Sequence, residues 1–378
     1  MRSSIAQRVA LAVLAAAAVG SAWAADTAAC GRWPAWESFR ARFVADSGRV
    51  IDPVAHTTSE GQSYGLFFAL VANDPAAFAS ILRWTEDNLA GGDLTARLPA
   101  WQWGKQNENA WGVIDDNAAS DSDMWIAYSL LEAGRLWRMP KYAALGQLLA
   151  ERILREESVQ LPGLGRTVLP GPRGFQPRAG TARLNPSYFP LQLVQRLAGL
   201  FPDSAWKEVA AGAVEIVVRS APKGFAPEWV IYQADGGFRP DPESNAVGSF
   251  NAIRVYLWAG MLAEDEPARP ALLAALAPMA RHVAEQGTPP LEVDTRSGIA
   301  KGAGPAGFSA ALLPFLQASG RADLAAQQRL RIEAKAALER ADNYYEQALG
   351  LFGLGWMDGR YRFARDGALL IQWTCGAN

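Results

Sequence analysis

The chain has 378 residues, with 36 basic and 38 acidic side chains, 14 Trp, two His and two Cys. Half of the residues are apolar and a fifth are charged, which excludes a disordered chain and a small disulfide-stapled domain. Two histidines exclude most His-rich zinc sites, and the charge balance lacks the basic excess of nucleic-acid-binding proteins.

The N-terminal segment has the pattern of a secretory signal peptide. Arg2 and Arg8 form a charged region, residues 10–19 are an unbroken apolar run, and Ala22-Trp23-Ala24 fits a cleavage site. We therefore expect residues 1–24 to be removed, leaving residues 25–378 as a single domain. The apolar run is too short to span a bilayer and no later segment is long enough. The mature protein is expected to be periplasmic or secreted, with no membrane span.

The two cysteines lie near the ends of the mature chain. In an oxidising compartment, Cys30 and Cys375 either form a disulfide that closes nearly the whole fold or remain two buried thiols. The residues alone leave both possibilities open.

Helix-like periodicity recurs along the mature chain, separated by connections rich in Gly and Pro. It predicts about twelve helices, near residues 34–45, 60–71, 75–89, 121–137, 141–157, 187–200, 204–219, 246–262, 267–286, 306–318, 322–340 and 343–352. Strand patterns are few and short, near residues 229–233 and 361–363. The absence of βαβ alternation indicates an all-α fold and argues against a doubly wound sheet. Three long connections, residues 90–119, 160–185 and 287–305, are of the length that usually carries function.

Glu60 opens the second predicted helix, within Thr57-Thr58-Ser59-Glu60-Gly61. Thr57 and Glu60 have the spacing of a capping box, so Glu60 has a purely structural interpretation. The functional alternative places a carboxylic acid at the mouth of a buried helix, where glycines permit close approach. From spacing alone the cap is favoured, because a helix N-terminus favours the ionised carboxylate and a general acid needs a raised pKa.

The adjoining stretch Gly61-Gln62-Ser63-Tyr64-Gly65 matches the G-x-S-x-G pattern of serine hydrolases. That nucleophile elbow requires a preceding strand in an α/β sheet, which this chain does not predict. A serine esterase is therefore a distant alternative. His56 and His282 stand alone without metal-ligand spacing, and no metal or other cofactor is expected.

Tryptophans gather in the first long connection, at Trp101, Trp103 and Trp111, with Lys105 between them. Indole rings stack on sugar rings, while neighbouring amides and carboxylates bind the hydroxyl groups. Packing beneath a long loop explains any one of these rings equally well. Their combination with acidic residues favours a glycan-binding cleft.

Acidic residues follow this loop at Asp121 and Asp123, directly after Ser120. Ser120 at the N-cap and two acids in the first helical turn form an ordinary helix start. The two acids are two residues apart, so their side chains point to different sides of the helix. One of them can face a cleft while the other holds the helix end.

The segment from Ala119 to Trp137, with Ser120-Asp121-Ser122-Asp123-Met124-Trp125 at its start, resembles the signature of glycoside hydrolase family 8. Further motifs look like those of the family's endoglucanases associated with bacterial cellulose synthesis: Ser59-Glu60-Gly61-Gln62-Ser63-Tyr64-Gly65, Trp101 with Trp103-Gly104-Lys105, Asn185-Pro186-Ser187-Tyr188, Ala221-Pro222-Lys223-Gly224-Phe225 and Gly307-Phe308-Ser309-Ala310. The resemblance spans nearly the whole mature chain. It implies an (α/α)6 barrel, hydrolysis of β-1,4-glucan such as cellulose with inversion, and the cellulose synthase complex as a partner.

The resemblance also implies roles for individual residues. Glu60 matches the general acid, and Asp121 matches the signature aspartate at the point of cleavage. The implied substrate-binding residues are Trp101, Trp103, Lys105, Asp123, Tyr188 and Arg254.

The expected general base is where the chain departs from this pattern. Ser249-Phe250-Asn251-Ala252-Ile253-Arg254 resembles the family's segment, but Asn251 stands where Asp is usual. An amide cannot take a proton from water at neutral pH. Either the chain is catalytically impaired, or another carboxylate such as Asp121, Asp241 or Glu243 replaces the base, or the protein binds glucan without cutting it.

Overall fold

The computed structural model describes residues 32–335, 344–371 and 373 of the chain. Within these residues the structure has twelve α-helices, the number that the periodicity predicts. Their bounds are α1 Pro34–Phe43, α2 Ser59–Val71, α3 Pro75–Leu89, α4 Ser120–Leu136, α5 Pro140–Glu156, α6 Leu191–Leu200, α7 Trp206–Arg219, α8 Ile253–Gly260, α9 Arg269–Gln286, α10 Ala306–Ala318, α11 Ala322–Lys335 and α12 Tyr344–Met357.

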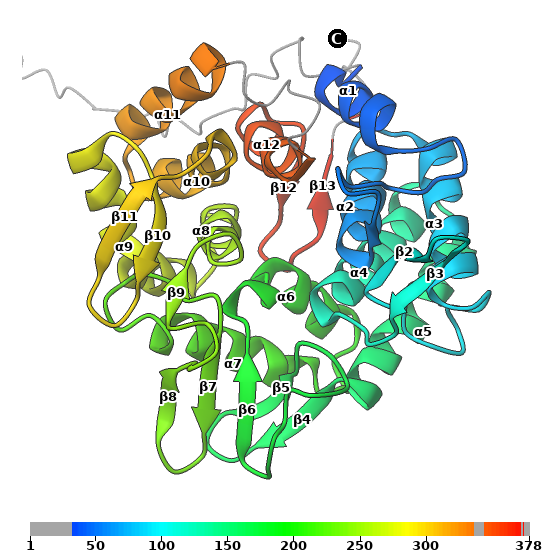
Figure 1. Cartoon of the computed structure of the whole chain (residues 1–378), viewed down its shortest axis with the longest axis horizontal. Coiled ribbons are helices and arrows are strands. Elements are labelled where there is room, and N and C mark those ends of the chain that lie inside the picture. The colour runs from blue at the N-terminus through cyan, green and yellow to red at the C-terminus, as the bar shows by residue number, and fades with distance from the viewer. Residues whose placement is uncertain (1–31, 336–343, 372, 374–378) are drawn as a thin grey trace, which may run out of the picture.

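The helices alternate between an inner and an outer ring around one axis, which is the arrangement of an (α/α)6 barrel (Figure 1). Inner helices are buried on nearly all sides: every residue of α8 is buried, and in α2 every residue except Glu60. Outer helices bury one stripe, as α5 does through Tyr142, Gly146, Leu149 and Ile153. That spacing follows the helical repeat, so the apolar face packs on the inner ring and the polar face meets water.

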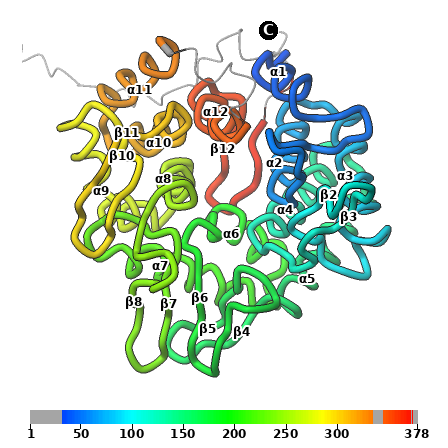
Figure 2. Tube along the Cα trace, viewed as in Figure 1, coloured from blue at the N-terminus to red at the C-terminus, as the bar shows by residue number. Residues whose placement is uncertain are grey.

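Phe352 of α12 closes the inner ring by joining the last helix to the first. Its ring lies 4.6 Å from that of Phe68 in α2, measured between centroids. It also lies 5.3 Å from Trp125 in α4 and 5.2 Å from Trp258 in α8. Each such aromatic pair contributes about 0.5–1.5 kcal/mol beyond the area it buries. Figure 2 shows the blue start and the red end of the described chain side by side, where α1 lies against α12.

A C-terminal hairpin of β12 (Arg362–Phe363) and β13 (Leu369–Leu370) occupies the centre of the ring in Figure 1. The Tyr128 hydroxyl donates to the carbonyl of Gly367 at 2.8 Å. Glu132, fully buried in α4, accepts from Arg196 at 2.8 Å and from the Leu369 amide at 2.9 Å. These contacts come from the later turns of α4, so the hairpin fills the barrel at the end away from the start of α4.

The remaining strands are short and antiparallel. They are β1 Thr57–Thr58, β2 Gln102–Asn107, β3 Ala110–Asp115, β4 Ser158–Leu161, β5 Gly165–Val168, β6 Thr181–Leu184, β7 Val230–Gln233, β8 Gly237–Pro240, β9 Val247–Gly248, β10 Pro290–Asp294 and β11 Ile299–Ala303. They form sheets in the orders β1-β2-β3, β4-β5, β6-β7-β8 and β11-β10-β9. The three long connections predicted as loops are therefore built largely from hairpins.

Some predicted boundaries are wrong. The helix expected over residues 246–262 begins only at Ile253, because Val247–Gly248 pairs as a strand with β10 and a turn follows. The helix expected from residue 187 begins at Leu191, after the 3-10 turn Pro186–Tyr188. The helix expected to end at residue 352 continues to Met357 as α12, so residues 350–355 lie inside it.

The predicted signal peptide, Cys30 and Cys375 all lie outside the described residues. Among the residues that are described, no helix is both long enough and apolar enough to cross a membrane.

Candidate active site

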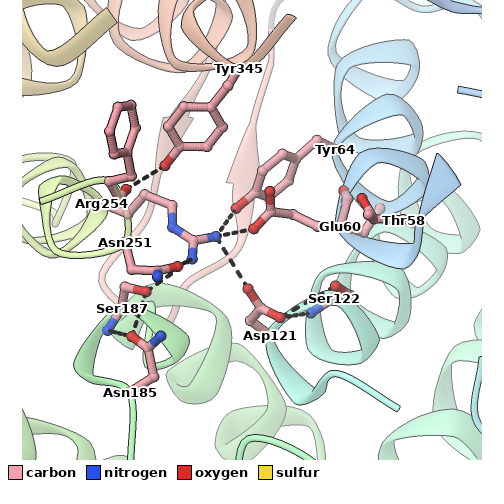
Figure 3. A network of polar contacts seen from close by, with 12 residues as sticks. Thr58, Glu60, Tyr64, Asp121, Ser122, Asn185, Ser187, Asn251, Arg254 and Tyr345 are labelled. Atoms are coloured by element: carbon pink, nitrogen blue, oxygen red, sulfur yellow. Dashed lines mark hydrogen bonds and ion pairs between the residues drawn. The ribbon is translucent and has the colours of Figure 1, made fainter. Parts of the chain in front are cut away.

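Polar residues from several inner helices meet at one end of the barrel. Glu60, Asp121 and Arg254 are each the second residue of an inner helix, in α2, α4 and α8 respectively. Figure 3 shows their side chains pointing toward one another, with Tyr345, the second residue of α12, bordering the same group. Inner helices that run in the same direction bring their N-termini together. Helix N-termini carry partial positive charge, so this end of the barrel suits carboxylates.

Glu60 is free of the capping role that its spacing predicts. Thr58 caps α2 instead, because its hydroxyl oxygen accepts from the Gly61 amide at 3.1 Å. The predicted pair of Thr57 and Glu60 is wrong, since the Thr57 hydroxyl donates to the carbonyl of Val50 at 2.7 Å. The Glu60 side chain is 28% exposed at the mouth of the otherwise buried α2, so its carboxylate is accessible from the barrel end.

Arg254 organises the site from a position that is 2% exposed. Its two terminal nitrogens donate to five side-chain oxygens, from Glu60, Tyr64, Asp121, Ser187 and Asn251 (Figure 3). Nη1 bonds Glu60 and lies 2.8 Å from the Tyr64 hydroxyl and 3.2 Å from Asp121. Nη2 lies 2.7 Å from Asn251 and 3.1 Å from Ser187. A single planar guanidinium therefore holds both predicted acids and the predicted base position together.

Asp121 is 3% exposed and uses both of its oxygens. One accepts from the Ser122 amide at 2.8 Å, and the other accepts from Arg254. Burial raises the pKa of Asp121 to about 6, and the Glu60 charge adds to the rise although Arg254 opposes it. The predicted cap at Ser120 is wrong, because Ser120 is already the first helical residue and no side chain caps α4.

Asp123 does not reach this group. It is fully buried and interacts electrostatically with Glu157, the residue that follows α5. Burial raises the pKa of both carboxyls, and each is raised further by a neighbouring carboxylate. The buried position therefore disfavours the charged form of both carboxyls. The expectation that Asp123 binds substrate is therefore corrected: it lies inside the protein, paired with Glu157.

This carboxyl pair predicts a pH-dependent stability. A folded-state pKa above the unfolded value contributes stability at low pH that is lost as pH rises through the folded pKa. Glu157→Gln keeps the shape of the side chain and removes one titrating group. We therefore expect the Tm of this variant, measured by calorimetry, to rise relative to that of the wild type as pH increases from about 5 to about 8.

Asp241→Asn is the matched control for this measurement. Burial alone would raise the pKa of Asp241, but hydrogen bonds from Arg183 and Ser244 lower it. Asp241→Asn removes a carboxylate that stabilises the folded state when ionised, so it is expected to lower Tm at neutral pH. This effect is opposite in sign to that of Glu157→Gln. A Tm-versus-pH curve of Glu157→Gln that runs parallel to that of the wild type would contradict the raised pKa of this carboxyl.

Asn251 lies in the turn before α8, and its amide is fixed from both ends. Its Oδ1 accepts from Arg254, and its Nδ2 donates to Oε2 of Glu228. Glu228 is not among the site residues that the sequence predicts, although it contacts Asn251, the residue at the expected position of the base. Its only sequence signal is an acid between Pro227 and Trp229, and 23 residues separate it from Asn251.

The tryptophans lie on the β2-β3 hairpin, which β1 joins to the start of α2. Trp103 and Trp111 stack with centroids 5.5 Å apart, and Trp84 meets Trp103 edge-on at 5.3 Å. The Arg49 guanidinium lies 4.3 Å from the Trp103 ring and 5.1 Å from that of Trp111. Trp103 and Trp111 thus both belong to a cation–π cluster, and Trp111 remains 49% exposed beside the exposed, cross-strand Lys105.

Trp101 is placed next to Glu60 by the backbone. Its carbonyl accepts from the Ser59 amide at 2.9 Å, and its own amide donates to Asn117 at 2.7 Å. The indole also bonds Asp115, which together with the Asn117 amide lowers the pKa of that carboxyl. Trp101 is half-buried, so part of this residue remains accessible.

Tyr188 forms another wall of the site. Its ring centroid lies 5.8 Å from the Arg254 guanidinium carbon and 6.1 Å from the Trp229 ring. Asp241 and Glu243, two of the alternative bases, instead bind Arg183 at 3.0 and 3.3 Å. Within the described residues, neither acid forms a hydrogen bond or ion pair with Asn251 or Arg254.

Ser63 is not a nucleophile elbow. It is buried one turn inside α2, and its hydroxyl donates to the Glu60 backbone carbonyl at 2.8 Å. His56 interacts with Gln102, 3.3 Å away, rather than with Ser63. In the described part of the chain, no three His, Cys, Asp or Glu side chains are grouped so as to hold a metal ion.

The sequence matches the family model described as "Glycosyl hydrolases family 8" over residues 10–359. It is 47% identical over 366 residues to an endoglucanase of Xanthomonas axonopodis pv. citri (strain 306), covering 96% of this chain and 95% of that protein. It is also 47% identical over 349 residues to the endoglucanase of Escherichia coli (strain K12), with 92% of each chain covered.

Solved structures give the same result. An endo-1,4-D-glucanase from Vibrio fischeri ES114 superposes with a TM-score of 0.87 at 45% identity, covering 90% of this chain and 99% of that chain. An endo-beta-1,4-glucanase from Acetobacter xylinum superposes with a TM-score of 0.72 at 26% identity, covering 89% and 99%.

Proposed function

Because the chain belongs to glycosyl hydrolase family 8, we propose that it is an endo-β-1,4-glucanase that cleaves its substrate with inversion at the anomeric carbon. The observation that carries the proposal is the convergence of Glu60, Asp121 and Arg254 from three helix starts. Carboxyl groups on opposite sides of a glycosidic bond supply the acid and the base of such a reaction.

Glu60 is the general acid in this proposal. It is the one residue of α2 that is not buried, so a sugar can reach its carboxyl group. Before it can donate to the leaving oxygen it must carry a proton, and only its Oε2 bonds Arg254, so Oε1 is available for that proton. Arg254 has Asp121 and Tyr64 as other acceptors, so it remains satisfied when Glu60 turns to the substrate.

Asp121 and the aromatic side chains bind the sugar at the cleavage point. Asp121 accepts hydrogen bonds from hydroxyl groups, and Trp101 and Tyr188 present ring faces beside Glu60 and Arg254. Trp111 and Lys105 extend the surface outward along the hairpin, toward a longer β-1,4-glucan chain.

The setting proposed for this activity is bacterial cellulose biosynthesis. The signal-like residues 1–24 support export to the periplasm or the medium, and the motif resemblance supports action on nascent cellulose next to the synthase complex. The 14 tryptophans and the near-balanced charge fit a neutral polysaccharide as the partner.

The test follows the stereochemistry of the product. Wild-type protein is incubated with cellopentaose, and ¹H NMR records the anomer of the new reducing end. We expect the α-anomer to appear first and then to mutarotate, because inversion converts a β-linkage to an α-product. A β-anomer that appears first would contradict the mechanism.

A second function is favoured by Asn251, which cannot act as a base. In that case the protein binds glucan without cutting it. Intact cellopentaose after prolonged incubation, together with saturable binding in calorimetry, would support this second function.

A further inference from the structure

Glu228 stands next to the position that lacks a base. It lies between Phe225-Ala226-Pro227 and β7, and it is half-buried, so water reaches it. Its Oε1 accepts from the backbone amides of Ser249 at 2.8 Å, Asn251 at 2.9 Å and Ala252 at 3.3 Å. Its Oε2 accepts from the side-chain amide of Asn251.

These four donors fix the direction of the Glu228 carboxylate. All of them are N–H groups, so both oxygens act as acceptors. Oε1 is fully used by the backbone, whereas Oε2 has one partner and retains a second acceptor position. The Asn251 amide cannot turn around, because its Oδ1 accepts from Arg254 at 2.7 Å.

We propose that Glu228 is the general base of this chain, taking over through Asn251 the role that the family's pattern gives to an aspartate. The assignment rests on the proposed glucanase function. Water attacks the anomeric carbon while Oε2 of Glu228 takes one of its protons, and Glu60 gives its proton to the leaving glycosidic oxygen. The products are two shorter glucans, a protonated Glu228 and an ionised Glu60, which exchange their protons with solvent.

Geometry argues against Asp121 as the base. Its oxygen and that of Glu60 both lie within hydrogen-bond distance of the same Arg254 nitrogen. The two oxygens are therefore less than about 6 Å apart, below the roughly 6.5–9.5 Å that an inverting pair leaves for water. Glu228 does not share that nitrogen: it bonds Asn251, which in turn bonds the other terminal nitrogen of Arg254, so this upper limit does not apply to Glu60 and Glu228.

Asp241 and Glu243 are excluded by their partners. Asp241 is 1% exposed and accepts two hydrogen bonds from Arg183. The Glu243 side chain is 74% exposed and binds the same arginine. Neither carboxylate contacts Asn251, whereas Glu228 contacts it directly.

A structural role for Glu228 is also available, because its carboxylate ties down the turn that begins α8. Activity loss alone would not separate the two roles, so the experiment uses chemical rescue. Glu228→Gln and Glu228→Ala are assayed on cellopentaose with and without sodium azide, and Glu243→Gln is the control. Azide is an anion that needs no base, and its attack with inversion yields an α-glycosyl azide.

We expect Glu228→Gln to lower kcat by about 10²–10⁴-fold with a much smaller change in KM, and Glu243→Gln to keep wild-type kcat. Azide is expected to restore turnover of Glu228→Ala and to give the α-glycosyl azide. Adding Asn251→Asp to Glu228→Ala is expected to recover activity without azide, because it puts a carboxylate at the position that the family's pattern gives to the base.

Several results would overturn the assignment. The first is a kcat of Glu228→Gln equal to that of the wild type. The second is a Glu228→Ala variant that is inactive, forms no glycosyl azide and does not regain activity when Asn251→Asp is added. Wild-type protein that leaves cellopentaose intact would overturn the proposed function as well. The two failures are therefore distinguishable.

Discussion

Glu60→Gln is expected to lower kcat on cellopentaose or carboxymethylcellulose by about 10²–10⁴-fold, which is the usual contribution of a general acid. Glutamine has the same shape and keeps an oxygen that can accept from Arg254, but it has no proton to give to the leaving oxygen. KM is expected to change little, because the residues proposed to stack on the sugar are untouched. A reducing-sugar assay measures both parameters.

The loss should depend on the leaving group. Aryl β-cellobiosides with acidic phenols need little protonation, so Glu60→Gln is expected to retain far more activity on them than on cellopentaose. Asp116→Asn, whose side chain is 78% exposed and pairs with Arg173, serves as the matched control at a surface carboxylate. Equal losses of Glu60→Gln on both substrates would count against an acid role.

Arg254→Leu is expected to reduce the free energy of unfolding by about 3–5 kcal/mol, the range found when one partner of a buried ion pair is removed. Arg254 is almost inaccessible, and its removal leaves Asp121 buried without a counter-charge. The pKa of Asp121, already about 6, then rises further, and stability is lost as pH rises through it. The loss should therefore be larger at pH 8 than at pH 5, as measured by urea denaturation at about these two values.

Arg254→Lys separates charge from geometry in this experiment. An ammonium keeps the positive charge but cannot span Glu60, Asp121 and Asn251 as the planar guanidinium does. We expect it to recover most of the stability at pH 8 but little of the activity. Equal stability of Arg254→Leu and the wild type at both pH values would contradict the proposed electrostatic role.

The fold was largely predictable from local pattern. The stripe Tyr142, Gly146, Leu149 and Ile153 is visible in the sequence as an outer helix, and the chain alternates such segments with more apolar ones. The 246–262 prediction failed because apolar residues before Ile253 serve a strand and a turn, which periodicity does not distinguish over so short a run.

The site was only partly predictable. Glu60, Asp121 and Arg254 were found through motif resemblance, and spacing alone favoured a cap for Glu60 that Thr58 in fact provides. Asp123 was assigned to substrate binding by the motif resemblance, although the spacing already put it on a different side of the helix from Asp121, and it is buried in the protein. Glu228 was missed because its contact with Asn251 joins two turns that no local pattern connects.

The contact between Phe68 and Phe352 has a kinetic consequence. It joins the first inner helix to the last, so the barrel cannot close before nearly the entire chain is available. Contacts between such distant residues carry a large loop-closure entropy and slow the search for the native state. Until that late step, the apolar flanks of α2 and α12 remain open to wrong partners. A protein that must stay unfolded while it crosses a membrane would gain from this delay, because early segments have no closed core in which to become trapped.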